Sequence, residues 1–238
     1  MKRVLQMATP ATLLVAALSV AASASGAAAA SVTVSSYASG YYQNSGGTPS
    51  AGSTNIIEDS TRNNYFAFDL SGISGTVTGA KLTILGGNGF FSFNSSTPGT
   101  VTYSIYDATT NIGSLTGHTA GAAAFTDLGS GSVYGSTSVT TPANTTFASM
   151  PKLEIDLSGG ISSIAAALGG LFALGGGSNL GPNQGFLWIS STFDPVAQLT
   201  LEVSQTPLPA ALPLFATVLG GGGLAAWRRR RKQLRAAA

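Results

Sequence analysis

The sequence contains no cysteine, only one histidine and only two tryptophans. Without cysteine the chain has no disulfide, no thiolate metal ligand and no cysteine nucleophile. A single histidine cannot build a zinc site without cysteines beside it. Charged residues make up 8% of the chain. Its stability must therefore come from packed apolar side chains and hydrogen bonds.

Positive charge is nearly absent from the middle of the chain. Between Ser31 and Gln205 the only bases are Arg62, Lys81 and Lys152, and the same stretch holds all nine acids, so three minus nine gives −6. The overall pI of about 9.0 therefore comes from the two ends. This middle part has no basic patch to pair with phosphates, which excludes a basic nucleic-acid binder.

The N-terminus has the three regions of a secretory signal peptide. Lys2 and Arg3 form a positive start, Ala11 to Val20 is apolar, and Ala21 to Ala30 is almost entirely small residues. This order predicts a signal peptide over residues 1–30, which the secretion translocon and a signal peptidase would handle.

The cleavage site is predicted before Ser31. Ala28 and Ala30 satisfy the rule that small residues flank one arbitrary residue at the cut. The stretch Ala22 to Ala24 satisfies the same rule and remains the competing site.

The C-terminus has the composition of a membrane span followed by a stop. No charged residue lies from Leu208 to Trp227, and 20 residues of helix would be about 30 Å long, the thickness of a bilayer's hydrocarbon core. Five consecutive bases follow: Arg228, Arg229, Arg230, Arg231 and Lys232. Such clusters stay on the cytoplasmic side, so the C-terminus is expected inside, with Trp227 at the boundary.

This span makes a poor permanent anchor. If the helix starts near Leu212 with Pro213 in its first turn, it is only about 24 Å long. Gly220 to Gly223 are four consecutive glycines, which weaken helix further. A short, glycine-interrupted span behind a proline-rich turn suits a segment that is recognised and cut.

The tail resembles the PEP-CTERM sorting signal of Gram-negative bacteria. Pro207, Leu208 and Pro209 occupy the place of its Pro-Glu-Pro tripeptide, and the apolar span and basic cluster follow in the same order. The resemblance implies processing by exosortase, a membrane-embedded transpeptidase-like protease. Leu208 departs from the family's Glu and leaves the identity of the processing enzyme open. An ordinary C-terminal anchor is the alternative, and a GlyGly-type tail is disfavoured because the glycines here lie inside the span.

The middle of the chain alternates apolar and polar residues with the period of β-strands. The predicted strands are Ser31 to Ser36, Asn64 to Leu70, Thr76 to Leu85, Thr100 to Tyr106, Lys152 to Leu157, Phe186 to Ser190 and Gln198 to Val203. One short helix is predicted at Ile161 to Leu168, and Tyr41 to Thr54 is expected to be a long loop.

These strands predict a mainly β domain over residues 31–205, flanked by the signal peptide at 1–30 and the sorting tail at 206–238. The expected architecture is a jelly-roll-like antiparallel β-sandwich. Tyr65 to Ser71 followed by Val77 to Ile84 is similar to the opening hairpin of jelly-roll modules in bacterial surface and carbohydrate-binding proteins.

Few residues suggest catalysis. His118 lies in a small-residue stretch and is expected to be an exposed loop residue rather than part of a triad. Glu154 and Asp156 lie on the same face of a predicted strand, about 7 Å apart, which is also the spacing of a glycosidase pair. A solvated strand face is the favoured interpretation. No catalytic residue, cofactor or metal ligand is therefore assigned.

Two further features allow a functional and a structural interpretation. Glu58 and Asp59, with Asn55 before and Asn63 and Asn64 after, are predicted to form an oxygen-rich loop. It could hold calcium but lacks the spacing of a calcium loop, so ordinary loop polarity is the favoured interpretation. Aromatic pairs such as Tyr41-Tyr42 could stack on sugars or fold back over the core.

Three functional classes remain. A non-enzymatic cell-surface or matrix protein, associated with exopolysaccharide and biofilm, is what the PEP-CTERM resemblance implies. A carbohydrate-binding or adhesive module is the alternative, and a secreted hydrolase is disfavoured. The expected route is export through the inner membrane, a transient single-pass stage and then the cell surface or medium.

Overall fold

The computed structural model describes residues 29–45, 56–85, 90–91, 99–141, 148–149, 152–180, 185–189 and 196–204. All of them belong to one compact unit, Ala27–Thr206. The strands are β1 (Ala29–Ser35), β2 (Ala38–Gln43), β3 (Ile56–Asp59), β4 (Arg62–Asp69), β5 (Thr76–Ile84), β6 (Phe90–Phe91), β7 (Gly99–Asp107), β8 (Val133–Thr141), β9 (Ala148–Ser149), β10 (Leu153–Asp156), β11 (Leu171–Ser178), β12 (Gly185–Ile189) and β13 (Ala197–Ser204). The helices are α1 (Ile112–Thr116), α2 (Gly121–Leu128), the 3₁₀ turn η1 (Ser158–Gly160) and α3 (Ile161–Ala166).

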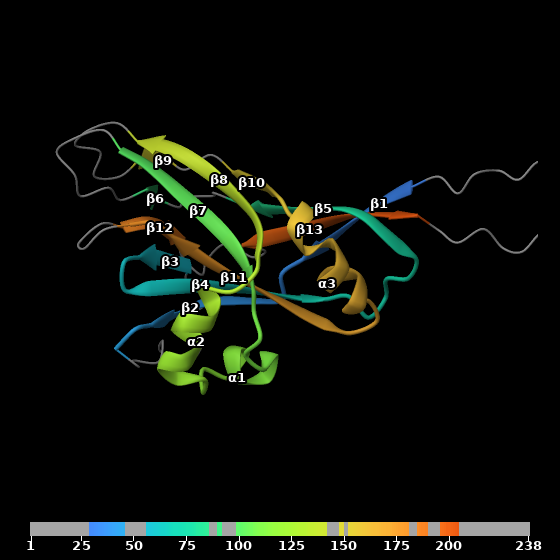
Figure 1. Ribbon diagram of the computed structural model, residues 1–238, viewed down its shortest axis with the longest axis horizontal. Helices are drawn as coiled ribbons and strands as arrows, with labels where there is room; N and C mark the ends of the chain where they lie inside the picture. Colours follow the sequence, from blue (N-terminus) through green and yellow to red (C-terminus); the bar gives the residue numbers. More distant parts are fainter. Residues whose placement is uncertain are drawn as a thin grey trace, which may run out of the picture. The chain divides into compact units, whose positions relative to one another are not determined.

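The described chain is mainly β, as predicted, and its strands form two antiparallel sheets (Figure 1). The first sheet has the order β1-β13-β5-β10. The second has the order β8-β7-β11-β4-β3-β12-β6-β9, with β2 also paired to β4. Each predicted strand coincides with an observed one to within one or two residues at either end, and the predicted helix is α3.

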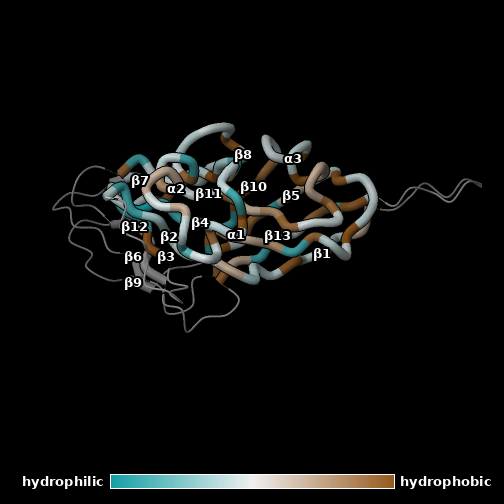
Figure 2. The backbone as a smooth tube through the Cα atoms, turned by 90° about the horizontal axis from the view of Figure 1, so that it is seen from below, coloured by the Kyte–Doolittle hydropathy of each residue, from teal (hydrophilic) through white to brown (hydrophobic). Residues whose placement is uncertain are grey.

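The two sheets share one apolar core. From the first sheet Leu82 and Leu201 are fully buried, and from the second sheet Phe66, Phe68 and Ile105 are fully buried in the same cluster. Alternation along each strand produces this arrangement, because side chains of every second residue point to the same face. Figure 2 shows hydrophobic and hydrophilic positions alternating along β13.

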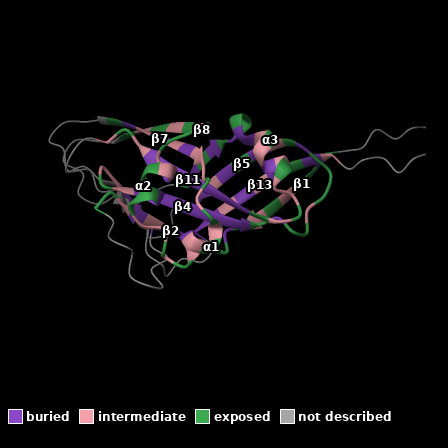
Figure 3. Cartoon of the chain, turned by 60° about the horizontal axis from the view of Figure 1, so that its bottom comes forward, coloured by how far each residue is buried: buried purple, intermediate pink, exposed green. Residues whose placement is uncertain are grey.

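A second, smaller cluster lies on the other face of the β2–β4–β11 region, where α1 and α2 pack. Tyr42 and Tyr65 lie with ring centroids 6.1 Å apart and meet Leu115 of α1 and Leu128 of α2. The Tyr42 hydroxyl donates to the carbonyls of Ser114 (2.9 Å) and Leu115 (3.0 Å). With both faces covered, β4 and β11 are buried along almost their whole length (Figure 3).

Three sequence expectations need correction. Tyr41 and Tyr42 lie in β2 rather than in a loop. His118 is half-buried rather than exposed, and it lies between two short helices, α1 and α2, which the sequence pattern did not predict. Glu58 and Asp59 end strand β3, and Asn63 and Asn64 belong to β4, so this oxygen-rich stretch is a β-hairpin.

No helix among the described residues is long and apolar enough to cross a membrane. The expected spanning tail, from Pro207 onwards, lies outside the described residues.

Candidate ligand-binding groove

The outward face of the four-stranded sheet carries a groove of about 390 Å³ whose surface is about equally polar and apolar. It crosses β13, β5 and β10 and is bounded by η1 and the start of α3. Its lining is hydroxyl-rich and charged: Thr78, Gly79, Ala80, Lys81, Thr83, Glu154, Asp156, Ser158, Ile161, Thr200 and Glu202. The groove exists because the apolar residues of β5, β10 and β13 alternate inward and leave their polar neighbours outside.

Strand pairing brings together charges that are far apart in the sequence. Because β10 pairs with β5, Asp156 lies opposite Lys81, and Glu154 lies opposite Thr83. The Lys81 ammonium lies 3.4 Å from Oε2 of Glu154, and the Lys152 ammonium lies 2.7 Å from Oε1. The two lysines thus hold the two oxygens of one carboxylate.

The two lysines also lower the pKa of the Glu154 carboxyl. The hydrogen bond and charge of Lys152, together with the charge of Lys81, hold the pKa of the Glu154 carboxyl below its ordinary value. A glycosidase needs one carboxyl whose pKa is raised, so that it can donate a proton near neutral pH. Glu154 has the opposite perturbation, and the Asp156 carboxylate accepts a 2.8 Å hydrogen bond from the Ser158 amide. The two carboxylates lie on one strand face, as their spacing predicted, and both line the groove. Glu154 is ion-paired, whereas Asp156 accepts a backbone hydrogen bond.

Threonine hydroxyls also line this face. Thr200 and Thr33 approach to 3.1 Å between their hydroxyl oxygens, which continues the polar face onto β1. Thr78 donates to the Glu202 carbonyl at 3.2 Å. A face of hydroxyls and carboxylates can exchange hydrogen bonds with the hydroxyls of a polar ligand.

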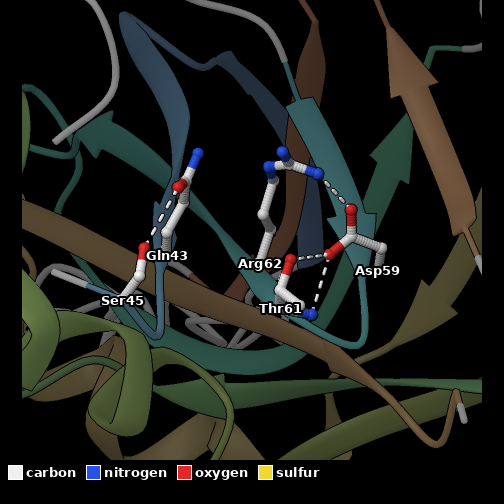
Figure 4. A network of polar contacts seen from close by, with 5 residues as sticks. All are labelled: Gln43, Ser45, Asp59, Thr61 and Arg62. Atoms are coloured by element: carbon white, nitrogen blue, oxygen red, sulfur yellow. Dashed lines mark hydrogen bonds and ion pairs between the residues drawn. The ribbon is translucent and has the colours of Figure 1, made fainter. Parts of the chain in front are cut away.

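A second hollow, of about 310 Å³, lies beside the β3–β4 hairpin and the end of α2. Asp59, Asn63 and Ser178 contribute to its lining. Figure 4 shows the hairpin turn, where the Asp59 carboxylate accepts from the Thr61 amide (2.8 Å) and hydroxyl (2.6 Å) and pairs with Arg62. These contacts within the turn occupy the Asp59 carboxylate, which the sequence had marked as a possible calcium ligand.

The other acid of this pair, Glu58, is fully buried behind the hollow. Its Oε1 accepts a 2.8 Å hydrogen bond from the Ser178 hydroxyl. Burial raises the pKa of the Glu58 carboxyl well above its ordinary value, despite this hydrogen bond. In the described part of the chain no group of three or more histidine, aspartate or glutamate residues is placed to hold a metal ion.

His118 has an unusual backbone but no catalytic partner among the described residues. Its φ is 56°, in the left-handed region that residues with side chains rarely adopt. Its Nδ1 is buried and has no hydrogen-bond partner in the described structure, so no carboxylate orients the ring as in a triad.

The structure describes only two of the residues predicted to take part in processing. Ala30 and Ser31, on either side of the predicted signal cleavage, lie in β1. The remaining predicted positions lie outside the described residues: Ala28, Pro207, Leu208, Pro209, Leu212, Pro213, Trp227, Arg228, Arg229, Arg230, Arg231 and Lys232.

No family model matches the chain, and no curated protein matches it. Function must therefore be inferred from this chain's own residues. Sequence alternation had already placed Glu154 and Asp156 on the same solvated strand face. It missed the approach of Lys81 to these carboxylates, because the pairing of β5 with β10 joins segments about 70 residues apart.

Proposed function

We propose that this chain is an exported, non-enzymatic protein of the cell surface or extracellular matrix, associated with exopolysaccharide and sorted by a PEP-CTERM-like tail. The observation that carries the proposal is the order of segments: a signal-like start, an acidic β domain, Pro207-Leu208-Pro209, an apolar span and five bases. An exosortase-like enzyme acts on the tail while the bases hold the C-terminus in the cytoplasm.

The β domain of this proposal is a jelly-roll sandwich. Its first strand lies beside its last in the order β1-β13-β5-β10, and β8-β7-β11-β4 form the facing set. Along the chain these eight strands pass from sheet to sheet as in the double Greek key of a jelly roll. The strands β2, β3, β12, β6 and β9 extend the second sheet.

Mass spectrometry of the protein recovered from the surface or medium of the producing cells tests this proposal, because it reads both termini. We expect an N-terminus at Ser31 and a C-terminus near Pro207–Pro209. Recovery of a chain that still carries Met1, or one that keeps Arg228 to Lys232, would overturn the proposed processing.

A carbohydrate-binding role is the second candidate, and the groove on the outward face of the first sheet favours it. The groove offers carboxylates and threonine hydroxyls at fixed strand spacing, and its volume falls within the range of small-ligand sites. A binder would recognise the polysaccharide through these hydrogen bonds rather than through catalysis.

A glycan array probed with the mature protein separates the two candidates. Binding that falls at least tenfold in Thr200→Val and stays unchanged in Thr100→Val, on the other sheet, supports a binding module. An array with no binding leaves the matrix role as the function. Turnover of a glycan that Glu154→Gln abolishes would overturn both and identify a hydrolase.

A further inference from the structure

The predicted signal-cleavage bond, between Ala30 and Ser31, lies inside a paired strand. In β1, Ala29 lies opposite Ser204, Ala30 opposite Val203, and Ser31 opposite Glu202. Strand β13, which supplies these partners, is the last strand of the domain. Cleavage would therefore create a new chain terminus at one end of the first sheet.

Hydrolysis of this bond consumes one water molecule and breaks the C–N bond. Ala30 leaves with a carboxylate, and Ser31 gains an α-amino group that is protonated near neutral pH. Before cleavage the same nitrogen is an uncharged amide. The processed chain thus carries a positive charge at a place where the precursor has none.

The Ser31 nitrogen can become charged without losing a bond to β13. The Ser36 amide donates to the Ala197 carbonyl at 2.8 Å, so every second amide of β1 faces β13. By this alternation the amides of Val34 and Val32 face β13, and the amide of Ser31 faces the open edge. Strand β1 ends the first sheet in the described part of the chain, so this edge has no paired strand.

Glu202 lies directly opposite Ser31 in the pairing of β1 with β13. Because the Ser31 nitrogen points to the open edge, the long Glu202 side chain has to extend past the Ser31 Cα to meet it. The Cβ atoms of two directly opposed residues lie about 4.5–5.5 Å apart on the same face of a sheet. Both Ser31 and Glu202 are exposed. Within the described residues no salt bridge reaches the Glu202 carboxylate.

The neighbouring residues of β5 do not occupy the Glu202 carboxylate. Opposite it on β5 is Gly79, which has no side chain, and the Glu202 Cγ lies 3.3 Å from where a Cβ would be. The nearest lysine along β5 is Lys81, which lies opposite Thr200 and is paired with Glu154 at 3.4 Å.

We propose that signal cleavage creates an ion pair between the new α-ammonium of Ser31 and the carboxylate of Glu202, which fastens the edge strand β1 to β13 in the mature protein. The pair compensates for the two strand positions, Ala29 and Ala30, that cleavage removes. This inference rests on the proposed function only for the position of the cut.

The test uses the mature protein purified from producing cells, with its N-terminus first read by mass spectrometry. Competitive acetylation as a function of pH then gives the pKa of the α-amine. We expect this pKa to be higher in the wild type than in Glu202→Gln by about 0.2 to 0.7, the range for an exposed pair. In 1 M salt the difference should shrink, because salt screens exposed charges.

Asp69→Asn is the matched control, because Asp69 is an exposed acid on the second sheet. It should leave the pKa of the amine unchanged. Equal pKa values in the wild type and Glu202→Gln, or an equal fall in Asp69→Asn, would overturn the ion pair. An N-terminus at a residue other than Ser31 would instead refute the proposed cleavage site, so the two failures are distinguishable.

Discussion

The hydroxyl of Ser178 donates a hydrogen bond of 2.8 Å to Oε1 of Glu58, a carboxyl that is completely buried. The other oxygen of this carboxyl, Oε2 of Glu58, is buried and has no hydrogen-bond partner in the described structure. An ionised carboxylate in this place would be poorly solvated, so the neutral form is favoured. Of the charged groups nearby, Asp59 repels a second negative charge, which acts in the same direction.

Glu58→Gln should stabilise the domain at alkaline pH and change little at pH 4. The folded state keeps a proton on Glu58 that the unfolded state releases, because the pKa of the folded carboxyl is raised. Stability is therefore lost as pH rises from the ordinary glutamate pKa to the raised value, by up to about 1.4 kcal/mol per pH unit. Urea unfolding of both proteins at pH 4 and pH 8 measures the difference. An equal free energy of unfolding at pH 8 would show that Glu58 is ionised without cost.

Asp127→Asn should show the opposite pH dependence. Although partial burial opposes it, hydrogen bonds from the hydroxyls and amides of Thr109 and Thr110 hold the pKa of Asp127 below its ordinary value. This contribution is present above the ordinary aspartate pKa and is lost as pH falls through the lowered one. We expect the substitution to cost about 1 kcal/mol at pH 7, and less at pH 3. A cost that is the same at both pH values would argue against a charged acceptor.

Gly135→Ala should destabilise the domain by about 1–3 kcal/mol. A Cβ at Gly135 on β8 would lie 1.8 Å from the carbonyl oxygen of Asp156, which belongs to the other sheet. Backbone at this distance must move, and the two sheets would separate locally. Gly72→Ala is the control, because no described atom lies within 4 Å of its added Cβ. Midpoints of urea unfolding measure both, and similar midpoints for the two variants would contradict the close approach.

Pro207→Ala combined with Pro209→Ala should leave membrane insertion intact and block maturation. Proline at both positions keeps the segment extended, the conformation in which proteases bind their substrates. Immunoblots of the membrane fraction should then detect an uncut form that accumulates. Replacing Arg228 to Lys232 with serine should instead release unprocessed protein, because each charge costs about 2.5–3.5 kcal/mol to move into hydrocarbon. Maturation of the proline variant at the wild-type rate would identify the tail as a plain anchor.

Sequence alternation predicted most of the strands because most have one buried face. In β10 and β13, buried residues alternate with more exposed ones, and the pattern was readable. β11 was missed because its three consecutive glycines conceal its period, whereas β4, which is buried just as fully, was readable from its aromatic residues. The short helices α1 and α2 were missed for a related reason, since glycine and other small residues dominate their sequences.

The groove was only half predictable. Which side chains point outward follows from local alternation, and Glu154 and Asp156 were placed together correctly. Their pairing with Lys81 depends on which strands become neighbours, and this is decided by long-range packing. The burial of Glu58 was unpredictable for the same reason, because its Ser178 partner is 120 residues away.

Gly175, Gly176 and Gly177 of β11 have a consequence for mutational tolerance. A glycine run usually marks a linker that accepts almost any residue. Here an added Cβ would lie 2.5 Å from the Leu128 carbonyl at Gly175 and 2.0 Å from the Tyr103 hydroxyl at Gly176. The run is tightly enclosed, with the last residue of α2 on one side and a core tyrosine on the other. Saturation mutagenesis of the chain should therefore find one of its least tolerant segments where the residues are smallest.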